Sequence, residues 1–202
     1  MNSAVPLGFD HRYIPGEGEL ADLTLLLLHG TGGDGDSLLQ LGYTLAPGAT
    51  LLSPTGKVRE GDSNRFFRRM AEGVFDQADL ELRTEELAEF VRDAADAYQF
   101  DPRYVVAVGY SNGANIAGSL VLRAPYVLAG AALLRPMVPF TPPEAPRLHH
   151  MPLLLCTGAL DAISPDTEGE RLAAILRAGD ADVTLHVERA GHELAMGDVV
   201  AA

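Results

Sequence analysis

The sequence has very little cysteine, almost no lysine and no long apolar run. Its single cysteine, Cys156, excludes an internal disulfide and fits a reducing compartment. No apolar stretch reaches the roughly 18 residues that a membrane span needs. Residues 1–13 lack a basic region followed by an apolar one, so we expect no signal peptide. Together these absences favour a cytoplasmic protein without a membrane partner.

Positive charge is also scarce. The 202 residues include 15 Lys and Arg against 28 Asp and Glu, which gives a net charge of −13, and Lys57 is the only lysine. A surface with this excess of negative charge repels nucleic acid and anionic membranes. We therefore expect no nucleic-acid partner.

Apolar, β-rich runs alternate with helical patterns over residues 1–202, which predicts a single α/β domain. The continuous hydrophobicity of the strand candidates suggests a mostly parallel sheet with helices on both faces. The expected strands are residues 23–29, 49–54, 104–110, 130–137, 152–158 and 182–188. The expected helices are residues 37–46, 83–100, 112–123 and 165–178, with a short last helix from about residue 193.

Two regions do not fit this alternation. Residues 55–82 are predicted to form a long ordered loop, and the proline-rich residues 136–152 are predicted to be extended. Long loops inside a compact domain are usually functional or disordered. The chain leaves no room for a large cap domain, so we expect an open site.

The segment GYSNG (109–113) is the first candidate for chemistry. It matches G-x-S-x-G and lies between a predicted strand and a predicted helix. The two glycines would let the strand and the helix pack closely around a strained turn at Ser111. The alternative is that Ser111 only caps the helix. The strand–turn–helix context favours a nucleophilic serine.

A nucleophilic serine needs a base and an acid that orients the base. Asp161 follows the predicted strand 152–158, and His192 follows the predicted strand 182–188. The carboxyl ends of parallel strands lie at one edge of a sheet, so both side chains are expected near Ser111. We therefore predict a Ser111–Asp161–His192 triad, against the alternatives of a surface acid and a turn histidine.

The other histidines lie inside a strand, before one, at the end of one or near the N-terminus, where structural or surface roles are expected. They are His11, His29, His149, His150 and His186. Asp166 and Glu168 fall at a predicted helix start, where capping explains them.

The glycine-rich segment HGTGGDGDS (29–37) follows a buried strand and precedes a helix. In hydrolases with a serine turn, such a loop supplies one N–H of an oxyanion hole, and the residue after the nucleophile supplies the other. Thr31 and Asn112 are the predicted donors, both through the backbone. The segment matches a phosphate-binding loop only loosely, and its two aspartates would repel phosphate. Nucleotide binding is the weaker alternative.

With these residues the sequence resembles the α/β-hydrolases of the phospholipase/carboxylesterase branch, and within it the small bacterial hydrolases related to methylhydroquinone resistance. The resemblance runs nearly from end to end, through LLHGTGGDGDSLL, VGYSNGANIA, RPMVP, TGALDAISP and AGHELAMGDV. It implies the same triad and the same oxyanion donors. Several related enzymes form dimers, so a homodimer is expected. Only residues 193–202 follow His192, so the last helix should be short.

The resemblance also suggests that residues 55–82 border the site and bring Arg65 and Phe66 to it. Arg65 would then bind a carboxylate or another anionic group of the substrate through paired hydrogen bonds. The alternative pairs Arg65 with nearby acids and buries Phe66 in the core. The sequence leaves both interpretations open.

The function that the sequence supports best is that of a serine carboxylesterase, which hydrolyses small esters without a metal or another cofactor. A thioesterase would use the same machinery. A dienelactone-type hydrolase usually has a cysteine nucleophile, whereas this turn carries Ser111 and Cys156 lies within a predicted strand. A non-catalytic binding protein of this fold would normally have lost a member of the triad, and none is missing.

Overall fold

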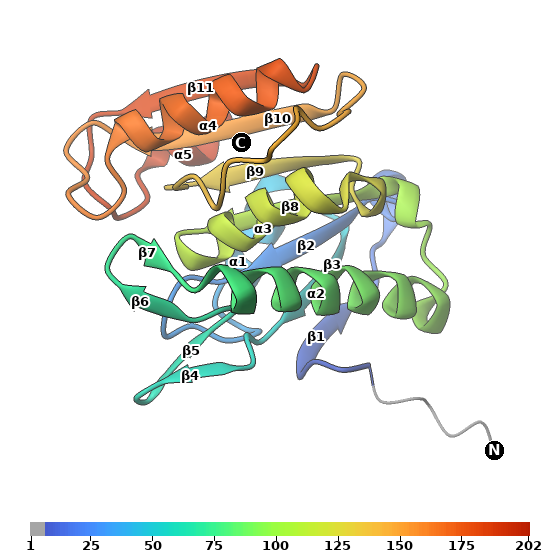
Figure 1. Ribbon diagram of the computed structural model, residues 1–202. Coiled ribbons are helices and arrows are strands. Elements are labelled where there is room, and N and C mark those ends of the chain that lie inside the picture. Colours follow the sequence, from blue (N-terminus) through green and yellow to red (C-terminus); the bar gives the residue numbers. More distant parts are fainter. Residues whose placement is uncertain (1–6) are drawn as a thin grey trace.

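Seven strands form the central sheet of the protein (Figure 1). The computed structural model describes residues 7–202. The expectation that there is no signal peptide rests partly on residues 1–6, which lie outside the described residues. The strands are β1 (His11–Ile14), β2 (Thr24–Leu28), β3 (Thr50–Pro54), β8 (Val105–Tyr110), β9 (Gly130–Leu134), β10 (Pro152–Gly158) and β11 (Asp182–Glu188). Their order is β1–β3–β2–β8–β9–β10–β11, and every neighbouring pair except β1 and β3 is parallel. The predicted α/β fold with a mostly parallel sheet is confirmed.

β1 is a strand that the sequence analysis did not predict. Its four residues pair antiparallel with β3, with His11 opposite Pro54 and Ile14 opposite Leu51. The strand lies at the edge of the sheet, and none of its residues is fully buried. It therefore lacks the continuous apolar run that marks the strands in the middle of the sheet.

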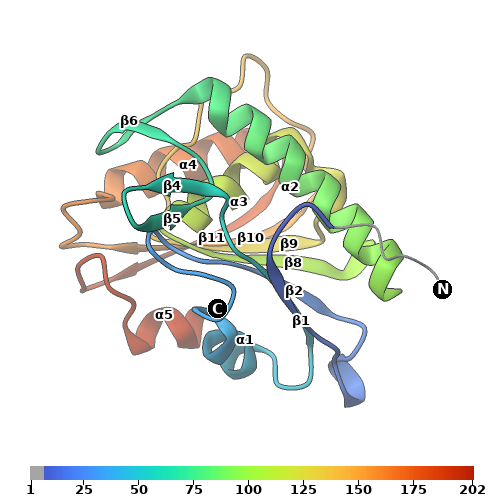
Figure 2. The same ribbon diagram turned by 90° about the horizontal axis from the view of Figure 1, so that it is seen from below.

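Helices cover both faces of the sheet, as Figure 2 shows. α2 (Gln77–Tyr98), α3 (Asn112–Arg123) and α4 (Asp166–Ala178) lie on one face, and α1 (Leu39–Leu45) and α5 (Met196–Ala201) lie on the other. The short 3-10 helices are η1 (Gly18–Leu20), η2 (Pro102–Tyr104) and η3 (Pro125–Val127). Within residues 7–202 no segment forms a large cap over the sheet. No helix of this range has both the length and the apolar character needed to cross a membrane.

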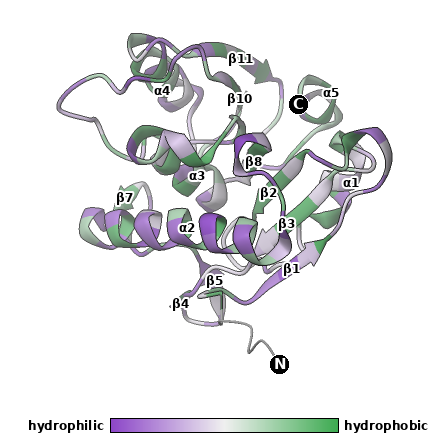
Figure 3. Ribbon diagram, turned by 90° about the vertical axis from the view of Figure 1, so that its right-hand side faces the viewer, coloured by the Kyte–Doolittle hydropathy of each residue, from purple (hydrophilic) through white to green (hydrophobic). Residues whose placement is uncertain are grey.

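Both faces of the sheet are buried, which explains the continuous apolar runs. In β2, Leu26 and Leu28 pack into the core on the side of α2 and α3, whereas Leu25 and Leu27 pack into the core on the side of α1. Successive side chains of a strand point to opposite faces, so a strand with helices on both sides is apolar at every position. Figure 3 shows the contrasting pattern of α2, where hydrophilic and hydrophobic residues alternate along a helix with one face on the core.

Residues 55–82, predicted as a long loop, contain more regular structure than expected. They form two small antiparallel hairpins, which lie beside the carboxyl ends of the sheet strands (Figure 1), and they also include the first residues of α2. The hairpin strands are β4 (Val58–Glu60), β5 (Ser63–Arg65), β6 (Arg69–Ala71) and β7 (Val74–Phe75). α2 begins at Gln77 instead of residue 83 because the Asp76 carboxylate accepts a hydrogen bond from the Asp79 N–H and caps the helix.

β9 ends at Leu134, earlier than the predicted residue 137. The next residue, Arg135, has a φ of +59°, in the left-handed region that a residue with a side chain rarely adopts and that ends an extended strand. Residues 136–151 form no helix or strand, in agreement with the predicted extended connection. The break at Arg135 leaves this residue at the carboxyl end of the sheet.

Candidate active site

Ser111 lies in a sharp turn between β8 and α3. Its φ of +54° and ψ of −114° are unusual for a residue with a side chain. The flanking glycines permit this turn, because a Cβ at Gly109 would lie 2.5 Å from the carbonyl oxygen of Gly113 and a Cβ at Gly113 would overlap the carbonyl of Leu28. In the described chain the Ser111 hydroxyl makes no capping bond to α3. The helix-cap alternative therefore does not apply.

The Ser111 hydroxyl instead begins a chain of hydrogen bonds. Its Oγ lies 2.8 Å from Nε2 of His192, and Nδ1 of the same ring lies 2.8 Å from Oδ2 of Asp161. The other oxygen of Asp161 accepts hydrogen bonds from the N–H groups of Ile163 and Ser164. With Nδ1–H donating to Asp161, the lone pair of Nε2 is left to accept the proton of Ser111. The structure thus brings the three predicted residues together.

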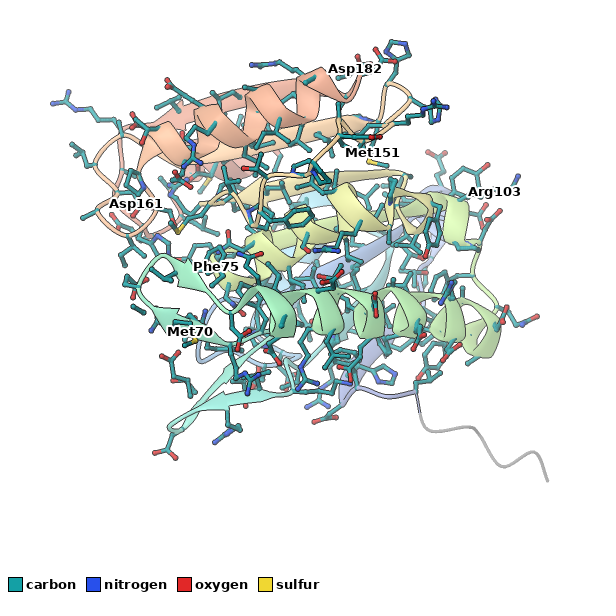
Figure 4. All side chains as sticks on the ribbon, viewed as in Figure 1. Met70, Phe75, Arg103, Met151, Asp161 and Asp182 are labelled. Atoms are coloured by element: carbon teal, nitrogen blue, oxygen red, sulfur yellow. The ribbon has the colours of Figure 1, made fainter. Side chains whose placement is uncertain are left out.

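These three side chains come from different strand ends. Ser111 follows β8, Asp161 lies shortly after β10, and His192 lies shortly after β11. Because the strands are parallel, their carboxyl ends meet at one edge of the sheet. Figure 4 labels Asp161 on this side together with Phe75 of β7, whereas Asp182, at the start of β11, lies on the opposite side.

His29, at the end of β2, has a different environment. It is buried, and burial lowers its pKa below the usual value. Its Nδ1–H donates to the carbonyl oxygen of Gly30 at 2.6 Å, and its Nε2 accepts a hydrogen bond from the Gly56 N–H at 3.0 Å. The neutral ring therefore joins two backbone loops, which is a structural arrangement.

Thr31 and Asn112 line the same cavity as Ser111. Among residues 7–202 the Thr31 N–H donates no hydrogen bond to a backbone carbonyl. Asn112 is the first residue of α3, and the first N–H groups of a helix have no partner within it. Both backbone N–H groups are therefore available to a substrate oxygen.

The Asn112 side chain has a role that the sequence analysis did not assign. Its Oδ1 accepts a hydrogen bond of 2.7 Å from the Phe66 N–H, and Nη1 of Arg65 donates one of 2.6 Å to Oγ1 of Thr31. The segment of Arg65 and Phe66 is thus tied to both predicted oxyanion donors. Phe66 and Asn112 are 46 positions apart in the sequence, and no local motif signals a hydrogen bond over that distance.

Phe66 does not line the cavity. Its side chain is 1% exposed, and its ring packs 4.7 Å from that of His29. A large apolar ring gains most from complete burial. This corrects the expectation that Phe66 contacts a substrate. Phe66 instead occupies the core position that the alternative interpretation gave it.

Arg65 lines the cavity, although it is only 3% exposed. Its Nε donates to the carbonyl oxygen of Phe67 at 3.1 Å, and its Nη1 lies 3.4 Å from the carboxylate of Glu60. Burial, together with the charge of Arg69, lowers the pKa of Arg65. The two interpretations left open by the sequence are thus compatible, since Arg65 pairs with an acid and also faces the cavity.

The cavity beside Ser111 is small, about 30 Å³. Its lining combines apolar side chains of Phe75, Met137 and Ile163 with the polar groups of Arg65 and Asn112. A larger hollow of about 420 Å³ lies against α2 and η3 but contains no residue of the triad. The predicted nucleophile, Ser111, therefore lies at the smaller cavity and not at the larger hollow.

Cys156 is not a competing nucleophile. It is buried in β10, and burial raises its pKa to about 12, so the thiolate is absent at neutral pH. In the part of the chain that the structure describes, no group of three or more His, Cys, Asp or Glu side chains is arranged to hold a metal ion.

No model of a protein family matches the sequence. The chain is 45% identical over 174 residues to “Putative hydrolase MhqD” of Bacillus subtilis (strain 168), and the match covers 86% of this chain and 87% of that relative. It also resembles the crystal structure of the Bacillus cereus carboxylesterase, with 43% identity, coverage of 95% of this chain and 90% of the other, and a TM-score of 0.91. The structure of YahD with malic acid is similar at 28% identity, with coverage of 96% and 95% and a TM-score of 0.89. The chain therefore belongs to the phospholipase/carboxylesterase branch of the α/β-hydrolases and is a hydrolase of the carboxylesterase type.

Proposed function

We propose that the protein is a serine carboxylesterase that hydrolyses small carboxylic esters through an acyl-enzyme intermediate. The observation that carries this proposal is the continuous hydrogen-bonded chain from Ser111 through His192 to Asp161, with both distances at 2.8 Å. A serine hydroxyl is a weak nucleophile unless a base lies within hydrogen-bond reach and is itself oriented by a third group.

In the first half of the reaction, Nε2 of His192 takes the hydroxyl proton of Ser111 while Oγ bonds to the acyl carbon. The electron pair of the carbonyl moves onto its oxygen, and Asp161 stabilises the imidazolium that forms. When the tetrahedral intermediate collapses, the bond to the leaving alcohol breaks. The alcohol takes its proton from His192, and the acyl group stays on Ser111.

In the second half, water replaces the alcohol. His192 removes a proton from the water, whose oxygen bonds to the acyl carbon, and collapse then breaks the bond to Ser111. The proton held by His192 returns to Oγ, so the carboxylic acid leaves and the enzyme is restored. In both halves the backbone N–H groups of Thr31 and Asn112 stabilise the oxyanion, and loss of one such donor typically costs about 10²–10³ in rate.

We further propose that the substrate carries a carboxylate or another anionic group that Arg65 binds. Among residues 7–202, Nη2 of Arg65 has no hydrogen-bond acceptor, and Arg65 lines the cavity that contains Ser111. A charged group held in a nearly dry site binds an opposite charge more strongly than the same group at the surface. YahD, one of the similar structures, was solved with malic acid, a small dicarboxylic acid.

A thioesterase is the second candidate, because the same three residues would cleave an acyl thioester. A non-catalytic binding protein is the third, and it needs neither the His192 nor the Asp161 hydrogen bond. A homodimer, a cytoplasmic location and the absence of nucleic-acid and membrane partners stay predictions from the sequence.

The test is turnover of p-nitrophenyl acetate and butyrate, together with matched acyl thioesters, by the wild type and by Ser111→Ala. We expect the alanine variant to lose at least about 10³-fold in kcat/KM, and we expect a higher kcat/KM for the ester of each matched pair. Full activity in Ser111→Ala would exclude the serine mechanism. A preference for the thioester would replace the carboxylesterase by a thioesterase, and a folded wild type without turnover of either would favour a binding protein.

A further inference from the structure

The segment that carries His192 is held by a buried arginine at the end of β9. Arg135 is completely buried, and its side chain makes five hydrogen bonds. Its Nε donates to the carbonyl oxygen of Gly191 at 3.0 Å, and its Nη2 donates to that of Glu193 at 3.0 Å. One side chain therefore holds the backbone on both sides of His192.

The carbonyl of His192 itself is held in the same way. The Tyr110 hydroxyl, at the end of β8, donates to this oxygen at 3.0 Å. Three consecutive carbonyls, those of residues 191, 192 and 193, thus accept hydrogen bonds from side chains at the carboxyl ends of neighbouring strands. In a surface connection, backbone groups mostly bond to water, so three consecutive carbonyls that are bound by side chains are unusual.

A buried charge needs a partner, and Asp198 of α5 provides it. Nη1 and Nη2 of Arg135 each donate to one oxygen of Asp198, at 2.9 and 2.7 Å, and Asp198 is 1% exposed. Its carboxylate also accepts a hydrogen bond from the Ala195 N–H at 2.8 Å. The short helix α5 is thereby joined through Asp198 to the arginine that holds the His192 segment.

The backbone of Arg135 is itself strained. Its φ of +59° is costly for a residue with a side chain. Gly158 shows how tightly the segment packs, because a Cβ there would lie 2.4 Å from the carbonyl oxygen of Gly191 and 3.2 Å from Nε of Arg135. The strain and the close packing indicate that the position of this backbone is fixed rather than incidental.

We propose that Arg135, paired with Asp198, is a positioning residue that fixes the His192 backbone so that the imidazole bridges Ser111 and Asp161. This rests on the proposed function, in which His192 is the base. Arg135 does not touch the reacting atoms. It acts through the carbonyls of Gly191 and Glu193, and a displacement of the base by about 1 Å is enough to lower a rate by about 10²-fold.

The test separates position from stability with three variants. Arg135→Lys keeps the charge but loses the planar group that reaches two carbonyls and two carboxylate oxygens together. The double variant Arg135→Met/Asp198→Leu removes both charges, so neither is left buried without a partner, and such apolar replacements are often tolerated. Ser119→Ala is the control, because it removes a buried hydrogen bond to Thr84 without touching the His192 segment.

We expect Arg135→Lys and the double variant to lose about 10²-fold in kcat for p-nitrophenyl butyrate while KM changes less than about threefold. The proton NMR signal of His192 Nδ1–H, assigned by its loss in His192→Gln, should weaken or shift in both. Ser119→Ala should keep both the signal and kcat.

A folded double variant with an unchanged Nδ1–H signal and wild-type kcat would overturn the proposal. The NMR readout needs no substrate, so it tests Arg135 even if the wild type hydrolyses no ester. A wild type that hydrolyses no ester but shows the His192 signal would therefore count against the proposed function and not against this inference.

Discussion

Two buried arginines lie close to the segments that carry Ser111 and His192, and they differ in how many of their donors the protein uses. Arg135 is 0% exposed, and its Nε, Nη1 and Nη2 all donate to acceptors of the chain. Arg65 is 3% exposed, and among residues 7–202 its Nη2 has no acceptor. Burial alone therefore does not distinguish them.

The difference lies in what each guanidinium is left to bind. Arg135 is neutralised by the buried Asp198 at two contacts, so it has no capacity for a ligand. Arg65 faces the half-exposed Glu60 at 3.4 Å and lies in the cavity beside Ser111. A saturated arginine fixes the backbone, whereas an incompletely paired one can bind a substrate anion.

The largest effect on stability is expected for Arg135→Met alone. This change leaves the Asp198 carboxylate buried without its partner, which typically costs about 3–5 kcal/mol. Urea unfolding should show this loss, and the double variant with Asp198→Leu should recover most of it. Equal stability of the single and double variants would mean that Arg135 and Asp198 do not form an ion pair in solution.

The next effect is expected for Arg65→Gln and concerns substrate preference. A hydrogen bond to a charged group contributes about 1.5–3 kcal/mol, so kcat/KM for a carboxylate-bearing ester should fall by about 10- to 100-fold relative to a neutral ester. Arg103→Gln is the control, because Arg103 pairs with Asp101 at the surface. An unchanged ratio of the two esters in Arg65→Gln would show that Arg65 only pairs with acids.

A smaller effect is expected for Tyr110→Phe. The change keeps the ring, which lies 5.5 Å from that of His192, and removes only the hydroxyl that donates to the His192 carbonyl. Arg135 still holds the carbonyls on both sides, so kcat should fall by about tenfold or less, in line with the roughly 1 kcal/mol of one hydrogen bond. A fall as large as that of Arg135→Lys would place the main restraint on Tyr110 instead.

The smallest effect is expected for His29, a buried side chain that is uncharged. Burial lowers the pKa of His29 in the folded protein, whereas in the unfolded chain it titrates near about 6.5. Below that pH the unfolded state binds more protons, so the contribution of His29 to stability is present above about pH 6.5 and is lost as the pH falls through the lowered value.

This loss amounts to at most about 1.4 kcal/mol per pH unit. Urea unfolding at pH 7.5 and 5.5 checks it, with His29→Gln as the variant that lacks the titrating ring. The wild type should lose more stability between the two pH values than His29→Gln. Equal losses would mean that the His29 ring is not held neutral.

The sequence predicted the features that follow from local patterns and from their order. The buried strands appear as continuous apolar runs, and the positions of Ser111, Asp161 and His192 after three parallel strands place them at one edge of the sheet. Asp76, three residues before Asp79, could also have marked the start of α2, because a capping acid at this spacing is a local signal.

Other features depend on contacts that no local pattern reveals. The hydrogen bonds of Arg135 to Gly191, Glu193 and Asp198 join residues 56 to 63 positions apart. The burial of Phe66 against His29 is likewise a tertiary contact, and the strands of the two hairpins are too short and too polar to show a period. Such contacts become visible only when the sheet brings the ends of its strands together.

In the proposed mechanism Ser111 is the nucleophile and His192 activates it. Labelling with a fluorophosphonate, followed by peptide mass spectrometry, tests it most directly. We expect a single modified residue, Ser111, with no labelling in Ser111→Ala and labelling slowed at least about 10²-fold in His192→Ala. Modification at another residue would show that Ser111 is not the nucleophile, and an unchanged rate in His192→Ala would show that His192 does not activate it.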